Sequence, residues 1–396
     1  MRHTYKLTLL FMLVTATTAV AQRSEFFIPQ TLAKSNNPAV HKVLNNPDKY
    51  KVKILLTPII KGEATVTYTY GNLNTYYYPA SFIKLPTAIA ACNFMDAVAD
   101  ERINDSTFIC IRKRDIACGF DKVNAVYDSL WYDDYFANII TRMLTVSDNT
   151  AYNMLYELMG QDFLNAQLPH MQLYKSFINK KLGACDTTQL RFTGPVALYN
   201  NVRYFNASVD SILSTFPLKA TRNYRKNENA VVGKAHIANG KLIKKGIDFS
   251  YANNIDIEEL HQLMQSLFAQ QTNLTHKKYI SLLKNSLLHT PTQSGLAAYT
   301  DSVKYPSTYN KYFFHDSEKA QLPTGYNVYN KVAMAYGFLG DCAYIENKAK
   351  GLRYYLTASI YCNNNEMLND GKYEYTTIGF PFLTELRKTI EAELSK

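Results

Sequence analysis

Segments rich in β-branched and aromatic residues lie near both ends of the chain and predict strands there. Lys51–Ile60 and Ala64–Tyr70 have this composition, and Gly62 in the turn between them predicts a hairpin. Three further strand-like runs lie near the other end, separated by turns that contain glycine or charged residues: Asn327–Met334, Asp341–Glu346 and Leu352–Cys362.

Between these strands the spacing of apolar residues is typical of helices. Phe82–Val98 is apolar with few helix-breaking residues, and it predicts a buried helix that has Ser81 at its N-terminus. Asp134–Met159 predicts a second helical stretch, which the polar tripeptide Ser147-Asp148-Asn149 interrupts. Two further helical patterns follow: Asn254–Phe268, with Asn254 as its N-cap, and Phe382–Leu394 near the end.

This order of elements predicts an α+β fold in which both ends of the chain build one antiparallel sheet. We expect the sheet to come from residues of about 45–75 and 325–396, and the helical part from about 81–320. Residues of about 186–250 are rich in Asn, Lys and Tyr without clean periodicity, which indicates an insert or an elaborated loop. Residues 22–396 are therefore expected to form a single domain.

The first 21 residues have the pattern of a secretory signal peptide. Arg2 and Lys6 supply a positive start, Leu7–Val14 forms a short apolar run, and Ala19-Val20-Ala21 has the small residues that signal peptidase prefers. The apolar run is too short to span a bilayer, and no later run is long enough for a membrane helix. The sequence therefore predicts cleavage after Ala21 and a periplasmic or secreted protein without a membrane span.

Composition and charge exclude several classes of protein. An apolar fraction of 47% excludes a largely disordered chain. The net charge is +10, but the lysines are scattered, so we expect no nucleic-acid partner and a monomer that acts on small molecules. The six cysteines form no C-x-x-C pair, and no histidine lies at metal-ligand spacing from them, so neither a metal nor a cofactor is expected. Cys110 and Cys118 are either a local disulfide or buried thiols.

Ser81 and Lys84 form the first candidate for catalysis. A serine hydroxyl is a poor nucleophile until a neighbouring base takes its proton. Side chains at i and i+3 share one face of a helix, so Lys84 can reach Ser81, and burial would lower the pKa of Lys84 enough for it to act as that base. Chance alone supplies S-x-x-K in a chain of this length, and the alternative for Lys84 is a solvated surface lysine.

Two later motifs support this candidate. Ser147-Asp148-Asn149 is a poor helix interior, but it is tolerable where the side chains face a cleft. Ser147 could then relay a proton to a leaving group and Asn149 could hold a substrate amide, whereas the alternative is an ordinary helix cap. Lys331 follows in a strand-like run; by itself it would be an ordinary strand lysine.

Three motifs follow one another along the chain: S-x-x-K, then S-D-N, then a K-T-G-like strand. This order resembles the class A β-lactamase and penicillin-binding-protein superfamily of serine hydrolases. The resemblance covers most of residues 51–396, apart from the insert, and implies a β-lactamase/transpeptidase-like fold. It implies that Ser81 is acylated, that Lys84 is the base or its proton relay, and that Ser147 protonates the leaving nitrogen.

The resemblance also implies how the substrate is held. Asn149 would position the substrate amide and Lys331 would attract the substrate carboxylate. The backbone N–H groups of Ser81 and Met334 would form the oxyanion hole. A small molecule or a peptidoglycan-like compound is the expected substrate.

Two departures from the family pattern concern turnover and recognition. The K-T-G triplet reads Lys331-Val332-Ala333, so no hydroxyl is available at Val332 and a methyl group replaces the glycine at Ala333. Class A β-lactamases use a glutamate in an E-x-x-L-N pattern to activate the deacylating water, but no glutamate lies between Glu157 and Glu228. The nearest acids, Asp162 and Asp186, are better explained as a helix-terminal charge and an N-cap.

Three functions remain open at this stage. The first is hydrolysis of β-lactam-like amides through an acyl-enzyme. The second is a D,D-peptidase or esterase of the cell envelope, which needs no such glutamate. The third is a low-turnover binding protein on the same fold. The absence of G-x-S-x-G and of H-E-x-x-H disfavours an α/β-hydrolase and a zinc peptidase.

Overall fold

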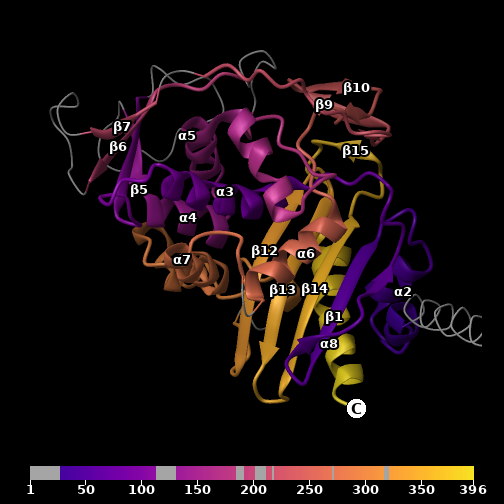
Figure 1. Ribbon diagram of the computed structural model, residues 1–396. Coiled ribbons are helices and arrows are strands. Elements are labelled where there is room, and N and C mark those ends of the chain that lie inside the picture. Colours follow the sequence, from indigo (N-terminus) through magenta and orange to yellow (C-terminus); the bar gives the residue numbers. More distant parts are fainter. Residues whose placement is uncertain are drawn as a thin grey trace, which may run out of the picture.

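The computed structural model describes residues 27–112, 131–183, 191–200, 211–215, 218–269, 272–315 and 321–396. The predicted signal peptide, Cys118 and Asp186 lie outside these residues. The described chain has two main parts, an antiparallel sheet and a group of helices beside it (Figure 1).

The sheet is built from both ends of the chain, as the sequence predicted. Its order is β12-β13-β14-β1-β2, and β3 also pairs with β1. The strands are β1 (Lys53–Ile60), β2 (Glu63–Ala64), β3 (Tyr68–Tyr70), β12 (Tyr326–Ala335), β13 (Phe338–Asn347) and β14 (Leu352–Tyr361). Strand β1 pairs antiparallel with β14, so that Leu56 lies opposite Leu356. This arrangement confirms the predicted α+β fold with one antiparallel sheet built from both ends of the chain.

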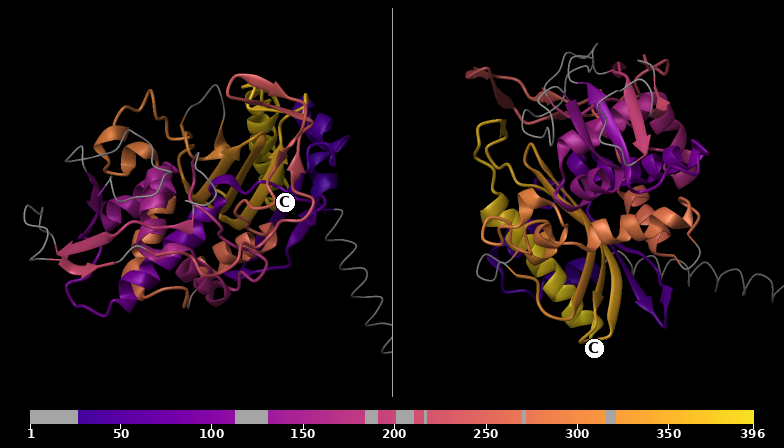
Figure 2. Two further views of the ribbon diagram at one scale, coloured as in Figure 1. Left: turned by 90° about the horizontal axis from the view of Figure 1, so that it is seen from above. Right: turned by 90° about the vertical axis from the view of Figure 1, so that its left-hand side faces the viewer.

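Two hydrophobic clusters lie on opposite faces of this sheet, because alternate side chains of a strand point to opposite faces. Ile54 and Leu56 of β1 pack with α2 (Pro38–Leu44) and α8 (Phe380–Leu394). Leu55 belongs instead to the cluster that includes the helical group. In the right-hand view of Figure 2, α8 runs alongside the strands on the side away from that group.

The helical group contains α3 (Lys84–Ala97), α4 (Phe136–Thr145), α5 (Asn149–Gln167), α6 (Ile257–Phe268) and α7 (Lys277–Leu288). The predicted break in the second helical stretch is confirmed, since α4 ends at Thr145 and α5 begins at Asn149. The sequence did not predict α7, which has lysines and serines among its apolar residues.

The predicted cap of α6 was wrong. The carboxylate of Asp256, not Asn254, accepts hydrogen bonds from the backbone N–H groups of Glu258 and Glu259, each at 3.1 Å. A carboxylate at this position also interacts favourably with the positive end of the helix dipole. Asn254 instead pairs through its backbone with Phe177.

The region expected to be an insert contains short strands in its described part. Strands β6 (Val196–Asn200) and β7 (Ser211–Ser214) join β4 (Thr107–Arg112) and β5 (Trp131–Tyr135) in a second sheet, in the order β5-β4-β6-β7. The others are β8 (Val231–Val232), β9 (Ala235–Ala238), β10 (Lys241–Ile243) and β11 (Ile247–Asp248), and β9 also pairs with β15 (Met367–Leu368). Figure 1 shows β9, β10 and β15 together near one end of the main sheet.

The described helices include none that is long and apolar enough to cross a bilayer. Cys92, Cys342 and Cys362 are buried thiols. Cys110 is buried in β4, and its suggested partner lies outside the described residues, so that pairing stays a prediction.

Candidate active site

Ser81 lies in a tight 3₁₀ turn, Ala80–Ile83, directly before α3. Ala80 has a left-handed φ of 45°, which is costly for a residue with a side chain and is typical of functional sites. Phe82 is buried against β13, where a Cβ on Gly340 would come within 2.8 Å of the Phe82 ring. The close approach that Gly340 permits therefore holds this strained turn, and with it Ser81, against the sheet.

Lys84 is fully buried, so it is not a solvated surface lysine. Its Nζ donates hydrogen bonds to Asn149 Oδ1 at 2.7 Å, to Ser147 Oγ at 3.3 Å and to the Ser147 carbonyl oxygen. Lys84 follows Ser81 by three positions in the helical turn, so the two side chains share one face. Two of the three sequence motifs therefore meet at the Lys84 amine.

The S-D-N tripeptide has two structural roles at once. The Asp148 side chain caps α5 by accepting a hydrogen bond from the Ala151 N–H at 3.0 Å. Ser147 has a left-handed φ of 61°, and this turn directs its hydroxyl toward Lys84. Arg142, which is itself buried, lies 3.8 Å from the Asp148 carboxylate and holds the turn from behind. The helix-cap alternative thus applies to Asp148, while the side chains on either side of it face Lys84.

Lys331 is also fully buried, on β12. Its Nζ donates to Ser147 Oγ at 2.9 Å and to the carbonyl oxygen of Val332 at 3.1 Å. Burial and the nearby positive charge of Lys84 both lower the pKa of Lys331 well below its usual range. The Ser147 hydroxyl therefore lies between two lysine amines that come from α3 and β12.

The residues that follow Lys331 alternate in direction along β12. Val332 and Met334 line the same cavity as Ser81, and Met334 is 46% exposed. Ala333, between them, is buried in the core that includes the helical group. The methyl group of Ala333 thus contributes to packing, whereas Val332 presents an apolar surface to the cavity.

Two cavities meet at Ser81, Asn149 and Met334, which line both. The first, of about 350 Å³, also contains Ser147 and an aromatic wall that includes His315 stacked on Phe380. The second has a volume of about 510 Å³. A larger cavity, of about 850 Å³, lies near residues 288–293, 302–307 and 321–328 and includes none of the motif residues.

Three aromatic rings form a cluster along the second cavity. Tyr78, Phe249 and Tyr336 contact one another with ring centroids 4.8 to 5.0 Å apart. Tyr373 and Lys180 line the same cavity. The sequence did not predict the three aromatic residues, Tyr373 or Lys180, because they come from separate segments and share no motif. The doublet Lys180-Lys181 was the one local signal, and it indicates charge rather than a site.

Acidic residues are absent from the described residues that line these two cavities. The Asp162 carboxylate instead accepts hydrogen bonds from the backbone N–H groups of Thr221 at 2.8 Å and Arg222 at 3.1 Å. Glu157 is buried in an ion pair with Lys181. Both acids therefore hold the structure together. The described residues also contain no group of three or more His, Cys, Asp or Glu side chains that could bind a metal.

Comparison with known proteins agrees with this fold. A β-lactamase from Sphaerobacter thermophilus is 14% identical, with a TM-score of 0.51 over 91% of this chain and 95% of that one. A class A β-lactamase from Bacteroides cellulosilyticus is 13% identical, with a TM-score of 0.50 over 92% and 99%. An acyl-enzyme complex of a PBP-A mutant with penicillin G is 14% identical, with a TM-score of 0.51 over 92% and 96%.

No curated protein adds a match to these structures. At such low identity the solved structures show a shared fold alone. The model of the β-lactamase enzyme family, however, matches residues 39–377, which is most of the chain and includes all three motifs. The protein therefore belongs to the β-lactamase enzyme family.

Proposed function

We propose that this protein is an exported serine hydrolase that forms an acyl-enzyme at Ser81 with an amide or β-lactam-like substrate. The observation that carries the proposal is the position of the Ser147 hydroxyl, which lies 3.3 Å from Lys84 Nζ and 2.9 Å from Lys331 Nζ. Ser147 lines the same cavity as Ser81. The proposed nucleophile and proton relay thus line one cavity, and the proposed base contacts the relay directly.

In the first step, Lys84 releases a proton to solvent, and its neutral amine then takes the proton of Ser81 Oγ as this oxygen attacks the substrate carbonyl carbon. The N–H groups of Ser81 and Met334 stabilise the negative charge that develops on the carbonyl oxygen. The bond to the leaving nitrogen then breaks, and Ser147 donates its proton to that nitrogen. Lys84 returns its extra proton to Ser147, which completes acylation.

The substrate is proposed to be a small molecule or a peptidoglycan-like compound with an apolar or aromatic acyl group. The Asn149 side chain is exposed at the cavity and is placed to hold an amide, and the second cavity offers aromatic surface. Carboxylate recognition is weaker than in relatives with K-T-G, since Val332 has no hydroxyl and the depressed pKa of Lys331 reduces its charge.

A D,D-peptidase or esterase is the second candidate, and one observation favours it. The described residues that line both cavities include no carboxylate to activate a deacylating water in the class A manner. A related fold, PBP-A, has been solved as an acyl-enzyme with penicillin G. Acylation followed by slow release is therefore the expected behaviour toward penicillins, and its extreme case is a low-turnover binding protein.

The remaining parts of the proposal concern the whole chain. Residues 1–21 would be removed on export, and residues 22–396 would act as a monomeric single domain in the periplasm or outside the cell. Mass spectrometry of the protein secreted from its expression host tests the cleavage after Ala21.

Labelling with a fluorescent penicillin and an activated aryl ester tests the acyl-enzyme. Intact-mass spectrometry should show one adduct in the wild type and none in Ser81→Ala, which keeps the backbone of the turn. A stable adduct supports acylation with slow release, whereas rapid appearance of opened antibiotic supports a β-lactamase. If neither reagent labels the protein and neither is hydrolysed, the hydrolase proposal is wrong.

A further inference from the structure

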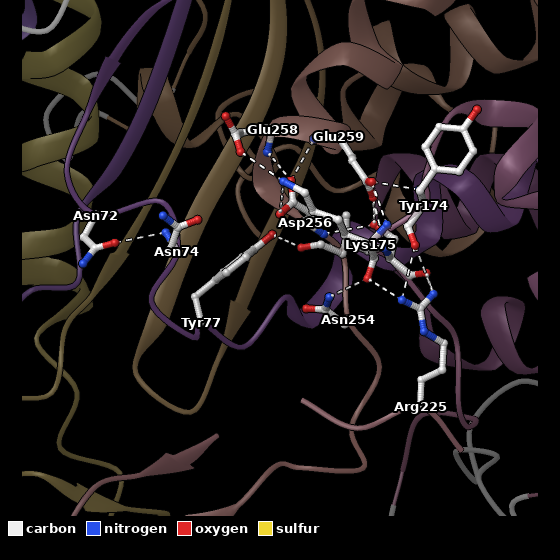
Figure 3. A network of polar contacts seen from close by, with 12 residues as sticks. Asn72, Asn74, Tyr77, Tyr174, Lys175, Arg225, Asn254, Asp256, Glu258 and Glu259 are labelled. Carbon is white, nitrogen blue, oxygen red and sulfur yellow. Dashed lines mark hydrogen bonds and ion pairs between the residues drawn. The ribbon is translucent and has the colours of Figure 1, made fainter. Parts of the chain in front are cut away.

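The segment of residues 174–183 enters the cavity beside Ser81, and its beginning is held rigidly. The Glu259 carboxylate on α6 accepts hydrogen bonds from the N–H groups of Tyr174 at 2.8 Å, Lys175 at 2.7 Å and Ser176 at 3.0 Å. The Arg225 guanidinium donates to the carbonyl oxygen of Tyr174 at 3.2 Å from the other side (Figure 3). The path of this segment is therefore fixed before it reaches the cavity.

The same kind of clamp fixes the backbone at Lys180. Asn253 Oδ1 accepts from the Lys180 N–H at 2.9 Å, and Asn253 Nδ2 donates to the Lys180 carbonyl oxygen at 3.0 Å. The Tyr152 hydroxyl donates to that carbonyl oxygen at 3.1 Å. Two residues later, Asn153 holds both the N–H and the carbonyl oxygen of Leu182. Side-chain amides thus set Lys180 in place, as expected for a residue whose position matters.

Lys180 lines the second cavity together with Ser81 and Asn149. Within the described residues its amine has no hydrogen-bond or ion-pair partner, whereas the neighbouring Lys181 is paired with Glu157. Desolvation lowers the pKa of Lys180 from its usual value, which increases the fraction of neutral amine.

Other titratable side chains that line this cavity do not compete for the same proton. Burial raises the pKa values of Tyr78, Tyr336 and Tyr373, so these phenols stay neutral at ordinary pH. Lys181 is held by its ion pair. Among the described titratable groups that line this cavity, Lys180 is therefore the amine whose neutral form burial favours.

We propose that Lys180 is the base that activates the water molecule which hydrolyses the Ser81 acyl-enzyme. This inference rests on the proposed function and supplies its missing second half. It gives a lysine the chemical role that a glutamate has in the class A pattern.

The step balances without any further reactant. The neutral Lys180 amine takes one proton from water while the water oxygen forms a bond to the acyl carbon of the ester. The tetrahedral intermediate collapses with cleavage of the bond between that carbon and Ser81 Oγ. The proton that Lys180 took from water then passes to Oγ, the acid product leaves, and both lysine amines are neutral again.

The test separates acylation from deacylation with a p-nitrophenyl ester that labels Ser81. The burst of nitrophenol reports acylation, and loss of the adduct by intact mass reports deacylation. In Lys180→Met the acylation rate should stay within about threefold of the wild type, while deacylation should slow by about 100-fold or more. Lys175→Met is the matched control, since it removes an exposed lysine of the same segment and should leave both rates unchanged.

Two further measurements distinguish a base from a binding charge. Lys180→Arg keeps the positive charge but holds its proton, so it should be as slow in deacylation as Lys180→Met. Methylamine should restore deacylation to Lys180→Ala by at least tenfold, and the wild-type deacylation rate should rise with pH where that of Lys180→Met does not.

Three outcomes would overturn the inference. Deacylation at the wild-type rate in Lys180→Met excludes Lys180 as the base. Normal deacylation in Lys180→Arg with a loss in Lys180→Met indicates that the residue binds an anionic group instead. If the wild type forms no Ser81 adduct at all, the proposed acyl-enzyme function is wrong. That result differs from normal acylation and normal deacylation in Lys180→Met, which would contradict only the role of Lys180.

Discussion

The hydroxyl oxygen of Ser147 lies 2.9 Å from the buried amine of Lys331, although the two residues come from different parts of the fold. Ser147 is in the turn between α4 and α5, and Lys331 is on β12 of the main sheet. The contact therefore joins the helical group to the sheet at the cavity that contains Ser81.

Removing the Ser147 hydroxyl should block the proton relay. We expect Ser147→Ala to slow acylation of an amide substrate by about 100-fold or more, because protonation of the leaving nitrogen loses its donor. An aryl ester should be affected less, since its leaving group needs no proton. Stopped-flow measurement of both acylation rates checks this. Equal losses on amide and ester would contradict the relay.

Ser147→Gly provides the matched control for that variant. It also removes the hydroxyl, but it relieves the left-handed φ of 61° at this position. Ser147→Gly should therefore be more stable to unfolding than Ser147→Ala by about 1 kcal/mol, with the same defect in amide acylation. If restoring stability also restored activity, the defect of Ser147→Ala would come from strain and not from the missing hydroxyl.

Filling the space at Gly340 should disturb the Ser81 turn. A Cβ there would lie 2.8 Å from the Phe82 ring and 2.7 Å from the Ala358 carbonyl oxygen. We expect Gly340→Ala to lower the free energy of unfolding by about 1–3 kcal/mol and to slow labelling at Ser81. Adding Phe82→Leu should recover part of both losses, because it removes the ring that the new methyl group meets. Urea unfolding and labelling rates of the single and double variants measure this.

The buried histidine between α6 and the sheet should make stability depend on pH. His261 lies 2.8 Å from the hydroxyl oxygens of both Thr57 and Thr357, and burial lowers its pKa to about 3. Its ordinary pKa is about 6.5, so between these values the unfolded chain binds one more proton than the folded one. The stability that neutral His261 retains above pH 6.5 is therefore lost as pH falls toward 3.

Between pH 6.5 and 5 this linkage amounts to about 2 kcal/mol. His261→Asn removes the titrating group, so its free energy of unfolding should fall by correspondingly less over the same interval. Urea titrations of both proteins at the two pH values compare the slopes. Parallel pH dependence in the wild type and the variant would show that His261 is protonated in the folded state.

The aromatic cluster should favour substrates with aromatic acyl groups. Tyr78 contacts Phe249 and Tyr336 along the second cavity, and a ring–ring interaction contributes about 0.5–1.5 kcal/mol. Tyr78→Leu should therefore reduce kcat/KM for phenylacetyl esters by about threefold to tenfold and leave acetyl esters nearly unchanged. An equal loss on both esters would place the effect in the Ser81 turn, which follows closely in the chain.

Much of the fold could be predicted from local composition, because β-branched and aromatic residues favour strands and a long apolar run without breakers favours a buried helix. Lys51–Ile60 and Phe82–Val98 were predicted for these reasons. The meeting of Lys84, Ser147 and Lys331 was expected from the family resemblance that the order of their motifs supports. Their chemical roles remain a proposal.

What escaped prediction depends on contacts between distant segments. Lys180 owes its position to Asn253 and Tyr152, and neither residue lies near it in the sequence. The N-cap of α6 was misplaced because Asn254 and Asp256 are both suitable caps, and backbone pairing of Asn254 with Phe177 decided between them. Strand β4 was not predicted, because it depends on pairing with β5 and β6, which are separate segments of the chain.

The pairing of β1 with β14 has a consequence for how the protein comes into existence. Lys53 of β1 lies opposite Ser359 of β14. Strand β1 is therefore synthesised long before the strand with which it pairs. Contacts between such distant residues form slowly, since a long loop must close before they stabilise anything. A chain still being synthesised has no completed sheet on which to seat the Ser81 turn. Ser81 therefore reaches its position against the sheet only after β13 and β14 have been synthesised.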